Sequence, residues 1–123
     1  MEQVIEREET KIEEIKFRKI VLPSLKSSVV VDLSEIEYLE SHGCYTEFSL
    51  VNGTRYTSSK PLLYYDELLR KYNFFRVHNK YIVNIEHVKG FAIGLPLKLI
   101  LTSGNLLHVS RLKKNDFMKL YLH

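Results

Sequence analysis

The chain has 123 residues, 45% of them hydrophobic and 27% charged, with a net charge of +3 and a single cysteine. This length and composition fit one folded domain with one core and exclude a wholly disordered chain. A single cysteine cannot form an internal disulfide, no apolar run approaches the roughly 20 residues of a membrane span, and the first residues are charged and acidic, unlike a signal peptide. We therefore expect a cytoplasmic protein with no membrane partner.

The N-terminal leader, residues 1–17, is acidic and predicts either a solvated segment or a linker helix. It carries six Glu against three Lys and Arg and contains no Gly or Pro. Its three isoleucines are too few for a sustained coiled coil, although a weak dimer contact remains an alternative. The predicted domain, residues 18–123, holds 15 Lys and Arg against 9 Asp and Glu, a basic surplus that weakly favours an anionic partner.

The first half of the domain predicts five short strands, rich in β-branched or alternating residues and bounded by Pro, Ser, Asp or Gly. In the third strand Ile36 and Tyr38 are expected on one face. A turn at residues 41–43 precedes the fourth strand. Asn52-Gly53, the strongest hairpin signal in the chain, pairs the fourth strand with the fifth. The five strands cover residues 19–25, 28–33, 36–40, 44–51 and 54–57.

A helix and a second group of strands follow. Ser59 is expected to cap this helix and Pro61 to lie in its first turn, ahead of an apolar stripe at i+3/i+4 spacing. The later strands fall within residues 74–84, 87–93, 97–102 and 106–109. A final helix, roughly residues 113–122, is expected to bury Phe117, Leu120 and Tyr121. Eight to ten short strands and two modest helices exclude a helix-turn-helix domain.

Residues 74–84, FFRVHNKYIVN, alternate apolar and polar side chains like a half-buried strand. In a continuous strand Asn79 would face the core, where an amide without hydrogen-bond partners costs about one to several kcal/mol. A strand that ends at His78 removes this cost, because Asn79 then lies in an exposed loop. We therefore predict a strand, a loop at residues 78–80, and an anchoring segment at residues 81–84.

The side chains of this loop allow two interpretations. Asn79 can read adenine in a major groove, while Arg76 and Lys80 can hold phosphates or guanine, with the imidazole of His78 beside them. Alternatively, the loop is a solvated junction in which Asn79 serves only as a turn former. The residues themselves leave both interpretations open.

A second polar cluster lies between the last strand and the last helix. Ser110 can cap that helix, and Arg111, Lys113 and Lys114 crowd its first turn. Cations at a helix N-terminus interact unfavourably with the helix dipole, so their placement is better explained if an anion binds there. Ordinary solvated charges are the alternative.

No pattern in the chain predicts catalysis, a cofactor or a metal site. Cys44 has no nucleophile elbow, oxyanion-hole glycines or orienting acid, so a small half-buried strand residue fits it better. His42 and Cys44 are two possible ligands with no further ligand beside them in the sequence, since the five histidines show neither zinc-finger nor H-E-x-x-H spacing. The five glycines are too scattered for a phosphate-binding loop.

Three stretches of the chain resemble the LytTR DNA-binding domain of bacterial response regulators. IEYLE, at residues 36–40, and the following GCYT resemble the first stretch of that family, and Val109-Ser110-Arg111 resembles its closing V-S-R. The resemblance covers residues 18–122. The central signature, an F-x-R-x-H block and a Y-[IL]-V-N block, is matched by Phe74, Arg76, His78, Tyr81, Val83 and Asn84.

The resemblance implies a mainly β fold of short antiparallel strands in small packed sheets, with two short helices. It also implies a transcriptional regulator that binds double-stranded DNA sequence-specifically, through loops that enter the major groove. The implied base-reading residues are Asn79, Arg111, His42, Cys44 and Tyr45; the implied phosphate-binding or supporting residues are Arg76, His78, Lys80, Lys113 and Lys114; and the implied anchors of the loop are Tyr81 and Asn84.

The partners implied by the resemblance are double-stranded DNA and an upstream receiver domain of a two-component system. A stand-alone regulator and a homodimer on repeated DNA sites are further alternatives. Two other classes stay open. A protein-interaction or ligand-sensing β domain would keep the fold without DNA contacts, and a single-strand binder would stack bases on Tyr45 and Tyr56.

Overall fold

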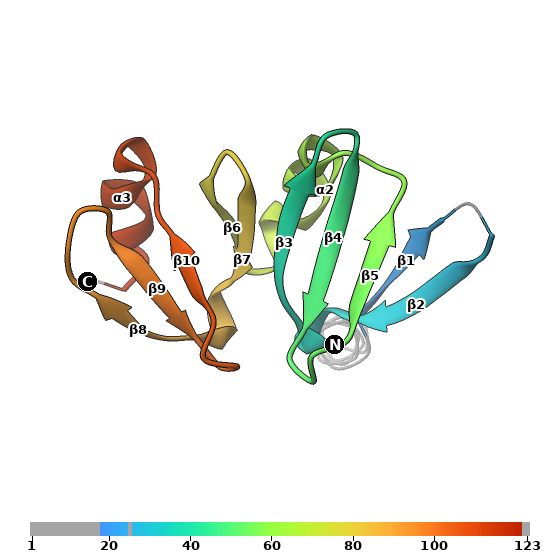
Figure 1. The fold of residues 1–123 in the computed structure, drawn as a ribbon, viewed down its shortest axis with the longest axis horizontal. Helices are drawn as coiled ribbons and strands as arrows, with labels where there is room; N and C mark the ends of the chain where they lie inside the picture. The colour runs from blue at the N-terminus through green and yellow to red at the C-terminus, as the bar shows by residue number, and fades with distance from the viewer. Residues whose placement is uncertain (1–17, 25, 122–123) are drawn as a thin grey trace, which may run out of the picture.

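The computed structural model describes residues 18–24 and 26–121, so the leader predicted at residues 1–17 lies outside the described residues. Within them the chain forms ten strands and two α-helices, with short 3-10 turns between (Figure 1). In chain order these are β1 (Lys19–Pro23), β2 (Ser28–Asp32), η1 (Leu33–Glu35), β3 (Ile36–His42), β4 (Tyr45–Leu50), β5 (Arg55–Ser58), α2 (Leu62–Leu69), η2 (Arg70–Tyr72), β6 (Phe74–His78), β7 (Tyr81–Asn84), η3 (Ile85–His87), β8 (Val88–Ala92), β9 (Lys98–Leu101), β10 (Leu106–His108) and α3 (Arg111–Met118).

The strands form three antiparallel sheets. The largest has the order β5-β4-β3-β7-β6, and it stands between the β1-β2 hairpin and the three-stranded sheet β10-β9-β8 (Figure 1). The two helices are separated by the five strands β6 to β10, so the described residues contain no helix-turn-helix. The predicted mainly β fold of small antiparallel sheets with two short helices is confirmed.

The first hydrophobic core lies between the five-stranded sheet, the β1-β2 hairpin and α2. The leucines and tyrosine of α2 recur at i+3/i+4 spacing, which turns Leu62, Tyr65 and Leu69 into the sheet. The predicted cap by Ser59 is wrong. Pro61 occupies the N-cap position with an extended backbone and no side-chain cap hydrogen bond.

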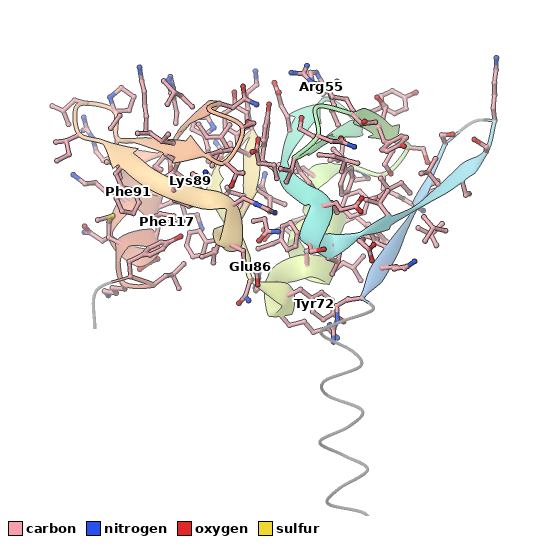
Figure 2. The ribbon with its side chains drawn as sticks, turned by 90° about the horizontal axis from the view of Figure 1, so that it is seen from below. Arg55, Tyr72, Glu86, Lys89, Phe91 and Phe117 are labelled. Atoms are coloured by element: carbon pink, nitrogen blue, oxygen red, sulfur yellow. The ribbon has the colours of Figure 1, made fainter. Side chains whose placement is uncertain are left out.

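The second core lies between β3, β6 and β7 on one side and the three-stranded sheet with α3 on the other. Phe117 is its fully buried aromatic residue, and its ring meets that of Phe91 edge to face at 6.2 Å (Figure 2). The predicted burial of Leu120 and Tyr121 is wrong, since both stay more than a third exposed. The physical reason is that α3 ends at Met118, so these two residues lie beyond the helix.

A bulge at the start of β3 makes the expected placement of Ile36 and Tyr38 on one face of the strand wrong. Ile36 pairs with Leu50 but Tyr38 pairs with Ser49, so Glu37 is an extra residue in β3. The extra residue reverses the alternation, and Ile36 enters the first core while Tyr38 enters the second. The two side chains therefore do not share a face.

The bulge also places a carboxylate in the interior. Glu37 is fully buried, and it accepts hydrogen bonds from the backbone N–H of Ser103 at 2.7 Å and from the Ser103 hydroxyl at 2.6 Å. The Asn105 amide lies at 3.5 Å from the same carboxylate. Ser103 and Asn105 belong to the β9-β10 turn, so Glu37 ties the five-stranded sheet to the three-stranded one.

Candidate nucleic-acid interface

Three connections that are far apart in the sequence lie along one edge of the molecule. They are the β3-β4 turn, the β6-β7 turn and the β10-α3 junction, all at the top of Figure 1. Two backbone hydrogen bonds join them in a row. Ser41 N–H donates to Lys80 O at 2.9 Å, and Ser110 N–H donates to Val77 O at 2.8 Å. The relative positions of the three connections are therefore fixed by the backbone.

The β6-β7 turn is closed by two of its own side chains. β6 ends at His78 and β7 begins at Tyr81, so the break in the strand falls at the predicted place. Arg76 Nη2 donates to Asn79 O at 2.8 Å, and Lys80 N–H donates to His78 Nδ1 at 3.0 Å. Arg76 and His78 thus shape the turn, while Asn79 and Lys80 are exposed at its tip.

Arg76 is held in turn by α2. Its Nη1 lies 3.6 Å from Asp66 Oδ2, and the two side chains are 25% and 16% exposed. Arg76 follows Phe74 by two residues in β6, so it lies on the same face of the strand as Phe74, which packs into the first core with α2. Asp66 is a supporting residue that the sequence reasoning missed, because a lone acidic residue on a helix gives no sign of a partner on β6.

Tyr81 and Asn84 fasten β7 to the body of the domain. Asn84 is buried, and its Nδ2 donates to Leu33 O at 3.3 Å and Ile36 O at 2.9 Å, while its Oδ1 accepts from the Glu86 N–H at 3.1 Å. These bonds reach backbone near the start of β3 and η3, not the β6-β7 turn itself.

The ring of Tyr81 connects the turn to the second core. Its centroid lies 5.5 Å from that of His78 and 6.3 Å from that of Tyr38. Burial raises the pKa of Tyr81, and the nearby Glu40 carboxylate and Tyr38 raise it further. The hydroxyl of Tyr81 is therefore neutral at physiological pH.

The β3-β4 connection is a two-residue turn, Gly43-Cys44, rather than the predicted turn at residues 41–43. Gly43 has a φ of 62°, in the left-handed region that glycine adopts without strain. His42 pairs with Tyr45 at the ends of the two strands. Cys44 is exposed in the turn, so its expected place as a half-buried strand residue is wrong. His42, Cys44 and Tyr45 form the exposed tip of this hairpin.

The third connection leads into α3. Ser110 is the N-cap, and its side chain accepts a hydrogen bond from Lys113 N–H at 3.3 Å. The helix begins at Arg111, two residues before the predicted start, and its first turn contains no acidic residue. Arg111, Lys113 and Lys114 are all exposed. This end of the molecule therefore presents three cations beside a helix N-terminus.

The hairpin tip carries negative charge that sequence reasoning missed. Glu40 and Glu47 face each other across β3 and β4, and His42 Nε2 lies 3.8 Å from a carboxylate oxygen of each. The two glutamates are seven positions apart in the sequence, and the pairing of β3 with β4 gives the only sign that they meet.

The chain matches the family model described as the LytTr DNA-binding domain, over residues 26–121. Among solved structures it is similar to one described as the LytTr DNA-binding domain of a methyl-accepting/DNA response regulator from Bacillus cereus. The TM-score is 0.72 at 25% identity, over 85% of this chain and 97% of the other. No curated protein matches the chain. In the described part of the chain, no helix combines the length and the apolar character that are needed to cross a membrane.

Proposed function

Since the chain belongs to the LytTR family of DNA-binding domains, we propose that it binds double-stranded DNA sequence-specifically through the three joined connections and acts in transcription. The observation that carries this proposal is the row itself. Three exposed tips with Lys80, Arg111 and Lys113 among their side chains stand on one edge, joined by two backbone hydrogen bonds. Loops on one edge can enter grooves on one face of a duplex.

Each connection has a distinct role in this proposal. Asn79 and Arg111 read bases, and so does the hairpin tip formed by His42, Cys44 and Tyr45. The remaining cations act on the backbone of the DNA or on the protein. Lys80, Lys113 and Lys114 bind phosphates, Arg76 and His78 support the β6-β7 turn, and Tyr81 and Asn84 anchor β7, the strand that follows it.

The proposed partners follow from the family. A regulator domain of this kind acts as the output module of a two-component response regulator or as a stand-alone relative, in the bacterial cytoplasm. An upstream receiver domain, residues 1–17 as the linker to it, and a homodimer on repeated sites all belong to the proposal. The proposed activity involves neither catalysis nor a cofactor.

The test is binding to DNA as a function of salt. A preferred duplex is first selected from a random pool, and its affinity is measured by fluorescence anisotropy at several salt concentrations. Four to six phosphate contacts predict a slope of log K against log salt of about −4 to −5. A slope near zero, or the absence of any selected sequence, would contradict the proposal and favour a protein-interaction or ligand-sensing domain.

Single-stranded DNA of the same sequence is the second arm of this experiment. A single-strand binder needs exposed rings on which bases stack. Tyr56 packs against the first core, which leaves Tyr45 as the exposed ring of the two predicted candidates. We therefore expect the duplex to bind more tightly than either single strand. A higher affinity for a single strand than for the duplex would indicate that the domain binds single-stranded nucleic acid instead.

A further inference from the structure

The β3-β4 hairpin gathers three side chains that can bind a metal ion. Glu40 and Glu47 are cross-strand partners, and His42 follows Glu40 by two residues, so strand alternation puts all three on one face. Their donor atoms all lie within 4.8 Å of one another, and His42 Nε2 lies 3.8 Å from each carboxylate. The two-residue Gly43-Cys44 turn fixes this register.

The charges in this cluster are only partly balanced by the protein. Two carboxylates directly opposite each other on paired strands repel, and both side chains are less than a quarter exposed. Arg55 Nη1 lies 3.7 Å from Glu47, but the Arg55 side chain is 59% exposed. In the described part of the chain, the ion-pair partner of Glu40 is His42, which carries charge only when protonated. The hairpin therefore holds a surplus of negative charge beside an imidazole.

We propose that Glu40, His42 and Glu47 bind a divalent transition-metal ion, with zinc as the probe. One imidazole nitrogen and two carboxylate oxygens suit zinc and its neighbours in the first transition row, whereas calcium and magnesium prefer oxygen ligands alone. The imidazole distinguishes this cluster from an ordinary pair of surface acids. Water would complete the coordination.

The separations between His42 and the two carboxylates are close to those that zinc requires, and the two carboxylates lie within 4.8 Å of each other. Bonds of about 2.0–2.2 Å in a tetrahedral arrangement put neighbouring donor atoms about 3.3–3.6 Å apart. The observed 3.8 Å between His42 Nε2 and each carboxylate needs only a small rotation of the side chains. His42 is half exposed, so its ring can make this rotation without disturbing the core.

Metal binding also has a consequence for DNA, and this second step rests on the proposed function. Without the ion, the two carboxylates repel the phosphates that approach the hairpin tip. A bound divalent ion cancels their charge, so the affinity for DNA rises. The ion also occupies His42 Nε2, which leaves Cys44 and Tyr45 as the base-reading residues of this tip.

The first arm of the test measures metal binding alone. Protein freed of metal with EDTA is titrated with zinc chloride by calorimetry, and the site is mapped by amide chemical shifts. We expect one zinc ion per chain, shifts centred on residues 40–47, and an affinity reduced about tenfold or more in His42→Ala and in Glu47→Gln. His108→Ala, which removes another exposed histidine, is the matched control and should bind zinc like the wild type.

Three outcomes of this arm would overturn the metal site. They are no zinc binding below about millimolar concentration, unchanged binding by both hairpin variants, or a loss in His108→Ala as large as in His42→Ala. His42 lies on the surface and Glu47→Gln keeps the shape of the side chain, so folding is expected in both variants, and chemical shifts outside the hairpin verify it.

The second arm compares DNA affinity in zinc and in EDTA. Wild type should bind its preferred duplex about fivefold or more tightly with zinc, within the range usual for coupled sites. His42→Ala should show no difference between the two conditions. Equal affinity of the wild type in both conditions would overturn the coupling. If no DNA binds in either condition, the proposed function fails, while calorimetry still decides the metal site.

Discussion

Replacing Asp66 with Asn should weaken DNA binding although Asp66 lies on α2 and not on a connection. Its carboxylate is 3.6 Å from Arg76 Nη1, and Arg76 Nη2 donates at 2.8 Å to Asn79 O. The amide keeps the size of the side chain but removes the charge that holds the guanidinium. The β6-β7 turn then loses the contact that fixes the orientation of Asn79.

The magnitude follows from the geometry of the Asp66–Arg76 pair. At 3.6 Å and an effective dielectric constant of about 20, the Coulomb attraction is about 4–5 kcal/mol. Desolvation of these side chains, which are 16% and 25% exposed, offsets most of this attraction. We expect the free energy of unfolding to fall by about 1–2 kcal/mol. DNA affinity should fall about fivefold, or about 1 kcal/mol, because Asn79 remains present but is less well oriented.

The assay is fluorescence anisotropy on the preferred duplex, with urea unfolding measured in parallel. Arg70→Gln is the control, because Arg70 Nη2 also lies 3.6 Å from Asp66 but is 71% exposed and belongs to η2 rather than to β6. It should leave DNA affinity unchanged. The salt slope of Asp66→Asn should match that of the wild type, since no phosphate contact is removed.

Two results would refute this reasoning. One is an equal loss of DNA affinity in Arg70→Gln and Asp66→Asn, which would point to α2 itself rather than to Arg76. The other is a full additional loss from Asp66→Asn in an Asn79→Ala background, because a residue that acts through Asn79 has no effect once Asn79 is gone.

Three further predictions concern the readers, the interior carboxylate and alkaline pH. Asn79→Ala should cost about 1–3 kcal/mol of DNA-binding free energy and relax the preference at one base position. Lys113→Ala should instead weaken binding to all DNA sequences alike and reduce the salt slope by about 0.9. Identical effects of the two variants in selection and salt experiments would contradict these roles. Glu37→Gln should lower the free energy of unfolding by about 1–3 kcal/mol, because one acceptor oxygen for the Ser103 N–H and hydroxyl is lost. An unchanged urea midpoint would be evidence against a stabilising role for the contact between Glu37 and the β9-β10 turn. The raised pKa of Tyr81, caused mainly by burial, means that the folded chain keeps a proton that the unfolded chain loses near pH 10.0. Stability from this residue is present below about pH 10 and is lost as pH rises through the raised pKa, so Tyr81→Phe should lessen the alkaline loss, as urea unfolding at increasing pH would show.

Local chemistry made much of the fold predictable. The position of the β6-β7 turn could be predicted from Asn79 alone, because its amide would be costly in the core of a continuous strand and has no such cost in an exposed turn. Asn52-Gly53 likewise predicted the pairing of β4 with β5, which the structure contains. Such inferences succeed because the free energy at stake belongs to the residue itself and to its nearest neighbours in the chain.

The errors have a different physical origin. The side of the sheet that Ile36 and Tyr38 occupy depended on the Glu37 bulge, and the bulge is stabilised by a turn some 66 positions away. The end of α3 was misplaced because helix length is set by what the helix packs against, and Phe117 alone provides its buried contact. Neither feature has a local signal.

The same division applies to the candidate site. The sequence by itself determined which side chains are available, namely a basic turn at residues 78–80, a basic helix start after Ser110 and a glycine hairpin at residue 43, because these depend on local turn and capping chemistry. Only the tertiary structure decided that the three connections share one edge, that Asp66 holds Arg76, and that Glu40, His42 and Glu47 meet. Those facts depend on sheet register and on packing between distant segments, and the sequence pattern of each segment contains no information about its partner.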